Sequence, residues 1–438
     1  MAKVITFEQV NAHAAAIDIG AAKVFVSSDG IQVRSYETFT ADYHLLVKDL
    51  QDAAVERVCM EATGVYWIAL YELLEEAGME VCLVNPKEVK QAKGRKTDLK
   101  DCRWIQRVFS AGLVRQSYVP AGKLKELRMM VREREDILQM GSAYVNKMQK
   151  CLELMNIKLT GVLSQVHGAS GIRLIEAIIA GQRDPHQLLL LCDKRIITSK
   201  SERVLKALEG NYNDSWIFLV AQNLKMWQLH EAQILVLDRK IEELLAALEA
   251  GKPEVASNAP VKAIRHHAPR VKELHQKMLN IYGVDGNTLS GINDYTLLRL
   301  LGEVGHDMSR FPSAKHFVSW CQLAPAFNNS GKMNRRIKIK SGSKAGQIFR
   351  DVAHGLLNSK HIAIGAFMRR IRGRKDSKIA VKAGAAKLAK AFYNLLTKGA
   401  AYVEQGVKKY EQQLQEREKT FLYKLAQKHN LQLINISD

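Results

Sequence analysis

Residues 14–39 read AAAIDIGAAKVFVSSDGIQVRSYETF. Runs rich in β-branched and aromatic residues predict three short strands there, over 14–20, 23–28 and 31–39. The dipeptide Asp29-Gly30 predicts a tight hairpin turn between the second strand and the third. The first part of the chain is therefore expected to begin with a meander of three strands.

Helix and strand patterns alternate after this meander. Buried strands are predicted over VERVCMEA (55–62) and MEVCLVN (79–85), and helices over 41–53, over 65–78 and from Thr97-Asp98 to Ala111. A meander followed by strands with flanking helices is typical of an α/β layer. We therefore predict an α/β domain over residues 1–115.

Downstream of residue 115 the patterns become helical. Apolar residues spaced three or four apart run from Leu124 to Met155 and again from Leu237 to Leu248, which is a coiled-coil pattern. A helical bundle within one domain fits the same spacing. We expect a helical coiled-coil region over 116–260, a basic, mostly α-helical domain over 261–410 and a C-terminal helix or tail over 411–438.

The charge of the chain is unevenly distributed. The 438 residues include 65 Lys and Arg against 45 Asp and Glu, a formal net charge of +20. Residues 331–410 alone hold 20 Lys and Arg against three acids, a net charge of +17. Such a segment favours a polyanionic partner, and nucleic acid is the leading one.

Other features of the composition exclude several classes of protein. No run reaches about 18 uninterrupted apolar residues, so we expect no membrane-spanning segment, and the first residues lack the apolar core of a signal peptide. The six cysteines are scattered without a CxxC pair, and we interpret them as reduced thiols of a cytoplasmic protein. P-loop, dinucleotide-binding and zinc motifs are absent from the sequence.

Four acids lie either in apolar strands, where burying a carboxylate costs free energy, or together on one face of a predicted helix. Asp18 ends the first apolar strand, Glu61 ends the fourth, and Asp98 and Asp101 are three residues apart on one helix face. Acids that converge usually hold a metal ion, and ligands that are all oxygen suit Mg²⁺ or Mn²⁺. Taken singly, each acid also fits a turn or a helix cap.

This combination resembles the RNase H/RuvC-like nuclease fold. The segments IDIG, CMEATGVYW, LVNPKEVKQ and GRKTDLKD also resemble the DEDD-type transposases of the insertion sequence 110 and 1111 groups. The resemblance implies that Asp18, Glu61, Asp98 and Asp101 ligate divalent metal and act in catalysis. It further implies a structured guide RNA encoded by the element, and assembly as a homodimer or homotetramer on DNA.

The C-terminal part resembles the same family over roughly residues 275–405, through FPSAKHF, LAP, SGK and KAGQ. In that family a serine of the SGK segment is the candidate nucleophile, and here that serine is Ser330. The segment has one glycine fewer than the frequent SGGK form, so Ser341 and Ser343 are competing candidates.

Basic residues around this serine are candidates for contact with nucleic acid, because Lys and Arg bind phosphate. They are Lys332, Arg335, Arg336, Lys338, Lys340, Lys344, Arg369, Arg370, Arg372 and Arg374. Residues 289–305 have a helix–turn–helix-like pattern in which Gly291 permits a turn and the next helix N-terminus could approach a phosphate. We interpret His266-His267 as a basic surface segment, because no third metal ligand is near in sequence.

The sequence thus predicts a transposase or recombinase that cleaves and rejoins DNA strands with a serine nucleophile and metal assistance. Two alternatives stay open. One is a metal-dependent nuclease of the Holliday-junction-resolvase type, in which water attacks. The other is a basic architectural protein without enzymatic activity.

Overall fold

The computed structural model describes residues 10–86, 89, 97–114, 116–257, 259–325, 327–330, 333–336, 342–359 and 362–431. The chain folds as two compact units, Met1–Val119 and Pro120–Asp438. The further divisions that the sequence predicts within the second unit stay predictions.

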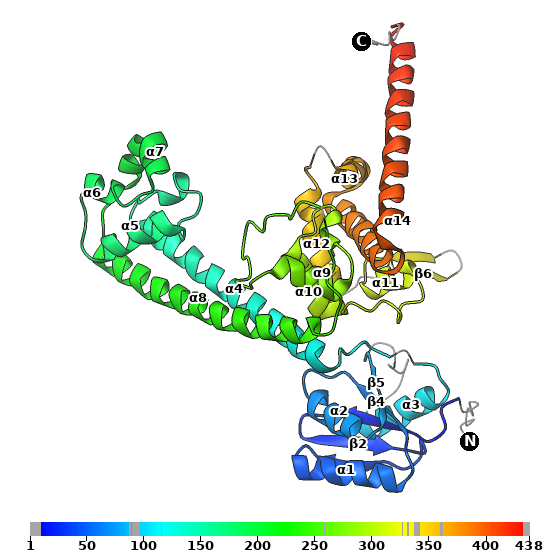
Figure 1. Cartoon of the computed structure of the whole chain (residues 1–438). Helices are drawn as coiled ribbons and strands as arrows, with labels where there is room; N and C mark the ends of the chain where they lie inside the picture. The colour runs from blue at the N-terminus through cyan, green and yellow to red at the C-terminus, as the bar shows by residue number, and fades with distance from the viewer. Residues whose placement is uncertain are drawn as a thin grey trace. The chain divides into compact units, whose positions relative to one another are not determined.

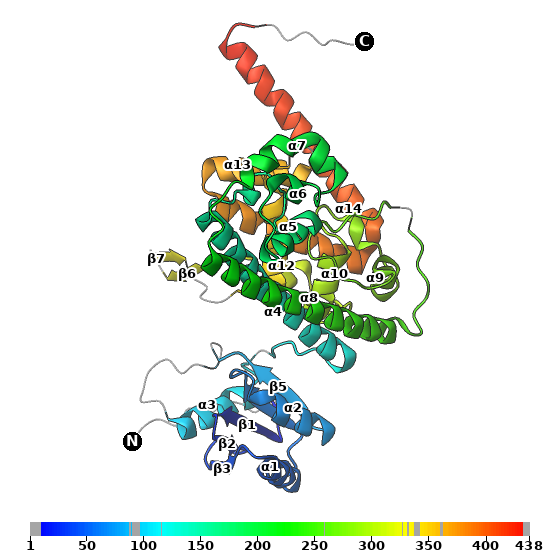
Figure 2. The same ribbon diagram turned by 90° about the vertical axis from the view of Figure 1, so that its left-hand side faces the viewer.

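The first unit is built on a five-stranded mixed sheet flanked by three helices (Figure 2). Its elements are β1 (Ala14–Ile19), β2 (Lys23–Ser27), β3 (Arg34–Glu37), α1 (Thr40–Asp52), β4 (Arg57–Glu61), α2 (Trp67–Glu76), β5 (Glu80–Val84) and α3 (Asp98–Ser110). The strands lie in the order β3-β2-β1-β4-β5. The first three strands are antiparallel, and β4 and β5 run parallel to β1. This mixed sheet confirms the predicted α/β architecture and is consistent with an RNase H-like fold.

The two faces of the sheet bury different helices because side chains alternate along a strand. Ala15, Ile17 and Ile19 pack with residues of α1 and α2. Ala14 and Ala16 face the other way, toward α3. Every element of this unit falls within a few residues of its predicted range.

The connection between β2 and β3 differs from the tight hairpin predicted from Asp29-Gly30. The strands end at Ser27 and begin again at Arg34, so six residues join them. The carboxylate of Asp29 accepts the N–H groups of Ile31 and Gln32, each at 2.8 Å. The aspartate therefore organises a longer loop instead of a two-residue turn.

The second unit is almost entirely helical in its described residues (Figure 1). Its first part contains α4 (Gly122–Leu154), η1 (Leu159–Gly161), α5 (Ala169–Ile179), α6 (Pro185–Leu189), α7 (Lys194–Ala207) and α8 (Asp214–Glu249). The rest contains α9 (Leu274–Tyr282), η2 (Gly286–Thr288), α10 (Asp294–Val304), α11 (Ala314–Trp320), β6 (Phe327–Ser330), β7 (Met333–Arg336), α12 (Lys344–Leu356), α13 (Ala363–Arg374) and α14 (Ser377–Lys428).

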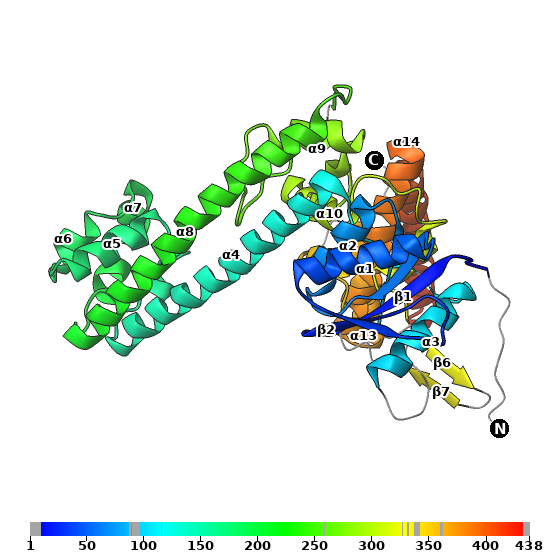
Figure 3. The same ribbon diagram turned by 90° about the horizontal axis from the view of Figure 1, so that it is seen from below.

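Helices α4 and α8 run side by side and form an arm (Figure 3). The apolar spacing predicts α4 and the last part of α8, from Leu237 to Leu248, but it predicts neither the longer first part of α8 nor the small lobe of α5, α6 and α7. This lobe buries its own core together with the adjoining ends of α4 and α8. The opposite ends of α4 and α8, through residues such as Leu127 and Leu244, join the main core with α9–α14. The heptad-like stripe thus serves two separate cores.

Residues 289–305 contain the predicted turn and helix, but side chains of the protein bind at the N-terminus of that helix, where the sequence suggests contact with a phosphate. Gly291 does make a turn, with φ of +75°. However, the N-terminus of α10 is capped by Asn293, whose side-chain oxygen accepts the N–H of Thr296. The adjoining Asp294 is buried and bonded to His275 and Asn287. Side chains of the protein therefore satisfy part of this helix end, and its approach to a phosphate stays a prediction.

The C-terminal helix also starts earlier than the sequence indicates. Regular helical geometry is broken at Gly399, with φ of 80° and ψ of 174°, and the helix continues to Lys428. A glycine adopts positive φ at no steric cost, so the chain bends at Gly399, whereas the sequence predicts a separate C-terminal segment only from residue 411. No helix among the described residues is both long and apolar enough to span a membrane.

Candidate active site

The pairing of β1 with β4 places two of the predicted acids next to each other. Ile17 is paired with Met60 in this parallel ladder. The next residue of each strand is Asp18 and Glu61, so the two acids stand side by side at the carboxyl ends of adjacent strands. By the alternation of side chains they share the α3 face of the sheet with Ala16.

Helix α3 brings the other two acids to the same edge. The side chain of Thr97 caps this helix by accepting the N–H of Lys100, so Asp98 and Asp101 lie in its first turn. One residue further on, the Cys102 thiol donates to the carbonyl oxygens of Ala16 and Phe25. This anchor holds the start of α3 over β1 and β2, directly beside Asp18.

The electrostatics of Asp18 report how near the other acids are. Burial, followed by the charges of Glu61, Asp98 and Asp101, raises the pKa of Asp18 to about 7. The N–H of Ile19 opposes this shift by hydrogen bonding to the carboxylate. The four predicted acids therefore form one electrostatic cluster, although they come from three different elements.

The donor set of this cluster fits a hard divalent cation. The cluster offers carboxylate oxygens, which Mg²⁺ and Mn²⁺ prefer. The raised pKa of Asp18 indicates an excess of negative charge there. Yet among the described residues no three acid, histidine or cysteine side chains are close enough to hold a metal ion as they stand.

The predicted nucleophile lies in the other unit, on a two-stranded hairpin. Ser330 ends β6 and pairs with Met333 at the start of β7. Arg335 and Arg336 lie on β7, opposite Asn328 and Phe327. Lys332, Lys338, Lys340 and Ser341 lie outside the described residues. The competing Ser343 caps α12, and its hydroxyl accepts the N–H of Gly346 at 3.4 Å.

The remaining predicted basic residues lie at the start of α12 and on α13. Lys344 is exposed in the first turn of α12, and Arg374 is exposed at the end of α13. Arg372 is exposed and donates to the side chain of Asn358 at 3.1 Å. Arg369 donates to the carbonyl of Ser359, and Arg370 lies over the ring of Phe367. The two half-buried arginines thus also hold the protein's own structure.

Comparison with known families matches two parts of the chain. A model of the DEDD type from the IS110 group, described as transposase, matches residues 15–157. A second model, described as transposase of the IS116/IS110/IS902 family, matches residues 287–348. Both models describe transposases of the IS110 group, so the protein is identified as a transposase similar to that group. No curated protein matches it.

A transposase is an enzyme, and its substrate is DNA. The first match contains all four acids, and the second contains Ser330 and the hairpin that carries it. The prediction of a transposase is therefore confirmed, and the architectural alternative is set aside.

No binding pocket on the arm of this transposase is predicted from its sequence. The sequence singles out only His266-His267, as a surface segment. The structure adds His167 to this pair, from a position about a hundred residues earlier, and the three histidines line one pocket. The sequence carries no signal for this grouping, because the loop that holds His167 reaches the others only after the lobe has folded.

Proposed function

We propose that this transposase cleaves and rejoins DNA strands by phosphoryl transfer, with Asp18, Glu61, Asp98 and Asp101 holding Mg²⁺ or Mn²⁺ and Ser330 as the nucleophile. The observation that carries the proposal is the raised pKa of Asp18, which arises from burial and from three acids drawn in from β4 and α3. Repulsion between these carboxylates destabilises the folded chain, and bound cations would relieve that repulsion.

The four acids have separable roles in this proposal. Asp18 and Glu61 are fixed by the β1–β4 ladder and form the rigid part of the site. Asp98 and Asp101 are attached to the first turn of α3, whose N–H groups favour nearby negative charge. When bound, divalent cations would neutralise the charge that develops on the phosphate and favour the attacking oxygen.

Ser330 would supply the oxygen that attacks the phosphorus. A bond forms between its Oγ and the phosphorus as the bond to the leaving strand breaks. The serine loses its proton, and the leaving oxygen gains one to become a hydroxyl. Because the bond energy is kept in the phosphodiester to serine, the hydroxyl of another strand can reverse the step without ATP. The basic residues near Ser330 would hold the phosphates of both strands.

The proposal includes a RuvC-like catalytic domain, a structured guide RNA and assembly as a homodimer or homotetramer. Two observations support these parts. The +17 segment at 331–410 offers more positive charge than a single duplex contact needs. Helix α8 also exposes the apolar side chains of Phe218, Leu229 and Val236, which suits contact with another copy of the chain.

A metal-dependent nuclease of the resolvase type is the second candidate. The observation in its favour is that the acid cluster belongs wholly to the first unit, Met1–Val119, whereas Ser330 belongs to the second. In this mechanism water attacks, Ser330 is a turn residue and the DNA ends leave the enzyme free.

A denaturing gel of labelled DNA, followed by peptide mapping of any shifted band, tests the choice. The wild-type protein should form a covalent DNA adduct at Ser330. Ser330→Ala should lose both the adduct and strand transfer, yet keep its stability within about 0.5 kcal/mol. Asp98→Asn should lose metal-dependent recombination but still fold and bind DNA.

Ser343→Ala is the matched control, since its hydroxyl caps α12. It should form the adduct, with a stability loss of about 1 kcal/mol from the missing cap. An adduct at Ser341 would move the nucleophile but keep the mechanism. Free DNA ends from both wild type and Ser330→Ala would establish water as the nucleophile instead.

A further inference from the structure

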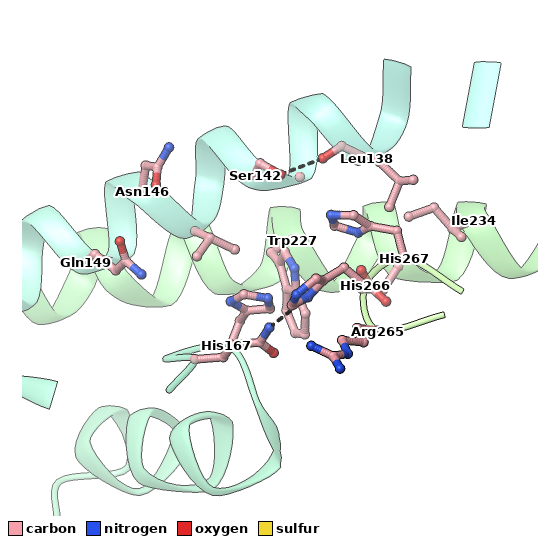
Figure 4. Close-up of a pocket in the computed structure, with 14 residues that line it drawn as sticks. Leu138, Ser142, Asn146, Gln149, His167, Trp227, Ile234, Arg265, His266 and His267 are labelled. Carbon is pink, nitrogen blue, oxygen red and sulfur yellow. Dashed lines mark hydrogen bonds between the residues drawn. The ribbon is translucent and has the colours of Figure 1, made fainter. Parts of the chain in front are cut away.

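A pocket of about 350 Å³ lies on the arm, within the second unit, and no residue proposed for catalysis lines it. Three parts of the chain line it: the facing sides of α4 and α8, the loop that leads to α5, and the segment at 265–267 (Figure 4). The pocket therefore exists only when the lobe and this segment both pack on the arm.

Flat rings form one part of the lining. Trp227 of α8 is half-buried, and the ring of His167 meets it edge to face, with centroids 6.0 Å apart and planes at 65°. Figure 4 shows His266 beside Trp227, and His267 beside Leu138 of α4. Aromatic and imidazole rings are the surfaces on which unpaired bases stack.

Carboxamide side chains form another part. Asn146 and Gln149 come from α4, and Gln165 comes from the loop before α5. The Nε2 of Gln165 lies 3.5 Å from Nδ1 of His266. A carboxamide offers a donor and an acceptor side by side, which matches the edge of a nucleobase.

The charges of the pocket disfavour a phosphate or a metal ion as its main occupant. Burial lowers the pKa of His167 and of His267, so both rings are neutral at neutral pH. Arg265 contributes one positive charge and Glu231 one negative charge. No three possible ligands among the described residues are placed to hold a metal. A neutral, planar and polar group is the better match.

We propose that this pocket binds one unpaired nucleobase of a nucleic-acid strand. The rings of Trp227 and His167 contact the base, the carboxamides of Asn146 and Gln149 bind its edge, and the exposed Arg265 binds a flanking phosphate. The site goes beyond the proposed function, because it involves neither the acids nor Ser330.

Fluorescence anisotropy with labelled eight-nucleotide single strands tests the proposal. Each RNA or DNA strand is compared with a strand of the same backbone that lacks bases. The buffer contains a chelator, and its salt concentration is raised to weaken contacts with phosphate. The wild-type protein should prefer the strand with bases. The double variant Asn146→Ala/Gln149→Ala should lose about tenfold in affinity for that strand and little for the abasic one.

The double variant Gln222→Ala/Gln233→Ala is the matched control, since both glutamines are exposed on α8 and do not line the pocket. It should behave as wild type. Arg265→Ala should weaken both kinds of strand equally, whereas Arg270→Ala, in the same segment but outside the pocket, should not.

A loss confined to RNA or to DNA would identify the source of the base, and a loss with both would support a shared site. If the carboxamide variant keeps the wild-type preference for bases, or if the wild type has none, the proposal is overturned. The assay involves no cleavage, so it can fail while the catalytic proposal holds, and the reverse is equally true.

Discussion

At Asp18 the proposed metal-binding role requires a charged carboxylate, whereas the stability of the fold favours a neutral one. Asp18 continues an apolar strand whose preceding residues Ala15, Ala16 and Ile17 are fully buried, and a charged group there loses hydration. The nearby acids add repulsion, so the protonated form is favoured up to a pH of about 7. Without a cation, this carboxylate should therefore work against folding at neutral pH.

Asp18→Asn should raise stability in metal-free buffer, and the gain should depend on pH. Because the folded pKa of Asp18 lies above the unfolded one, the carboxyl stabilises the fold at low pH and this contribution is lost as pH rises toward 7. The variant should match wild type near pH 4 and exceed it by at least about 1 kcal/mol at pH 8. Denaturant melts in chelator at both values measure the difference.

Asp29→Asn is the control, with the opposite sign. Burial is the largest single influence and raises the pKa of Asp29, but the N–H groups of Ile31 and Gln32 and the hydroxyl of Ser27 together outweigh it and lower the pKa. This carboxylate therefore stabilises the fold at pH values above its unfolded pKa, and the benefit disappears as pH falls through the folded pKa. Its Asn variant should be the less stable one at pH 8. Parallel pH profiles for wild type and Asp18→Asn would contradict the acid cluster.

At the scale of elements, a buried ion pair joins the two helices of the arm to the main core. Arg134 of α4 and Asp238 of α8 are each only 1% exposed, and their charged atoms lie 2.5 Å apart. Arg134 also donates to the hydroxyl of Tyr295 and the carbonyl of His267. The second oxygen of Asp238 accepts the N–H of Arg270. The pair thus holds the segment that forms one side of the arm pocket.

Asp238→Ala should cost about 3–5 kcal/mol, because it leaves the Arg134 charge buried without its partner. Replacing both residues, as Arg134→Met/Asp238→Leu, should recover much of that loss, since no buried charge then remains. Chemical denaturation measures both effects. Glu243→Ala, which breaks the exposed pair with Lys240 on the same helix, should change stability by less than about 0.5 kcal/mol. Equal losses in Asp238→Ala and Glu243→Ala would show that burial of the pair is unimportant.

At the scale of the whole molecule, the uneven charge should govern affinity for DNA. The logarithm of the binding constant should fall linearly with the logarithm of salt concentration, by about 0.9 for each phosphate neutralised on duplex DNA. Replacing Arg335 and Arg336 with Ala should therefore flatten that slope by up to about 2 units. Titrations of a labelled duplex at four salt concentrations give the slope.

Lys225 and Arg239 provide the comparison, since both are exposed on α8 and lie outside the +17 segment. Their double Ala variant lowers the net charge by the same amount. If it flattens the slope as much as the Arg335 and Arg336 variant does, the effect comes from total charge alone. The +17 segment would then not be the surface that binds DNA.

Much of the first unit could be predicted because its signals are local. Alternation of apolar residues marks β1, β4 and β5, and the spacing in 65–78 marks α2. Thr97 and the acids after it mark the start of α3. The long helices α4 and α8 follow from apolar residues three and four positions apart. In each case the preference of a segment agrees with the surface that it buries.

The tertiary structure alone decided what depends on contacts between distant residues. The β1–β4 register sets Asp18 beside Glu61, and the Cys102 anchor brings α3 to them. Because the lobe of α5–α7 packs on one end of the arm, α4 and α8 contribute to two separate cores. The same packing places His167 beside the pair His266-His267. Local periodicity specifies which elements form and which face each one buries. Which buried faces meet is settled by packing between segments that can be a hundred residues apart, and that packing creates both the acid cluster and the arm pocket.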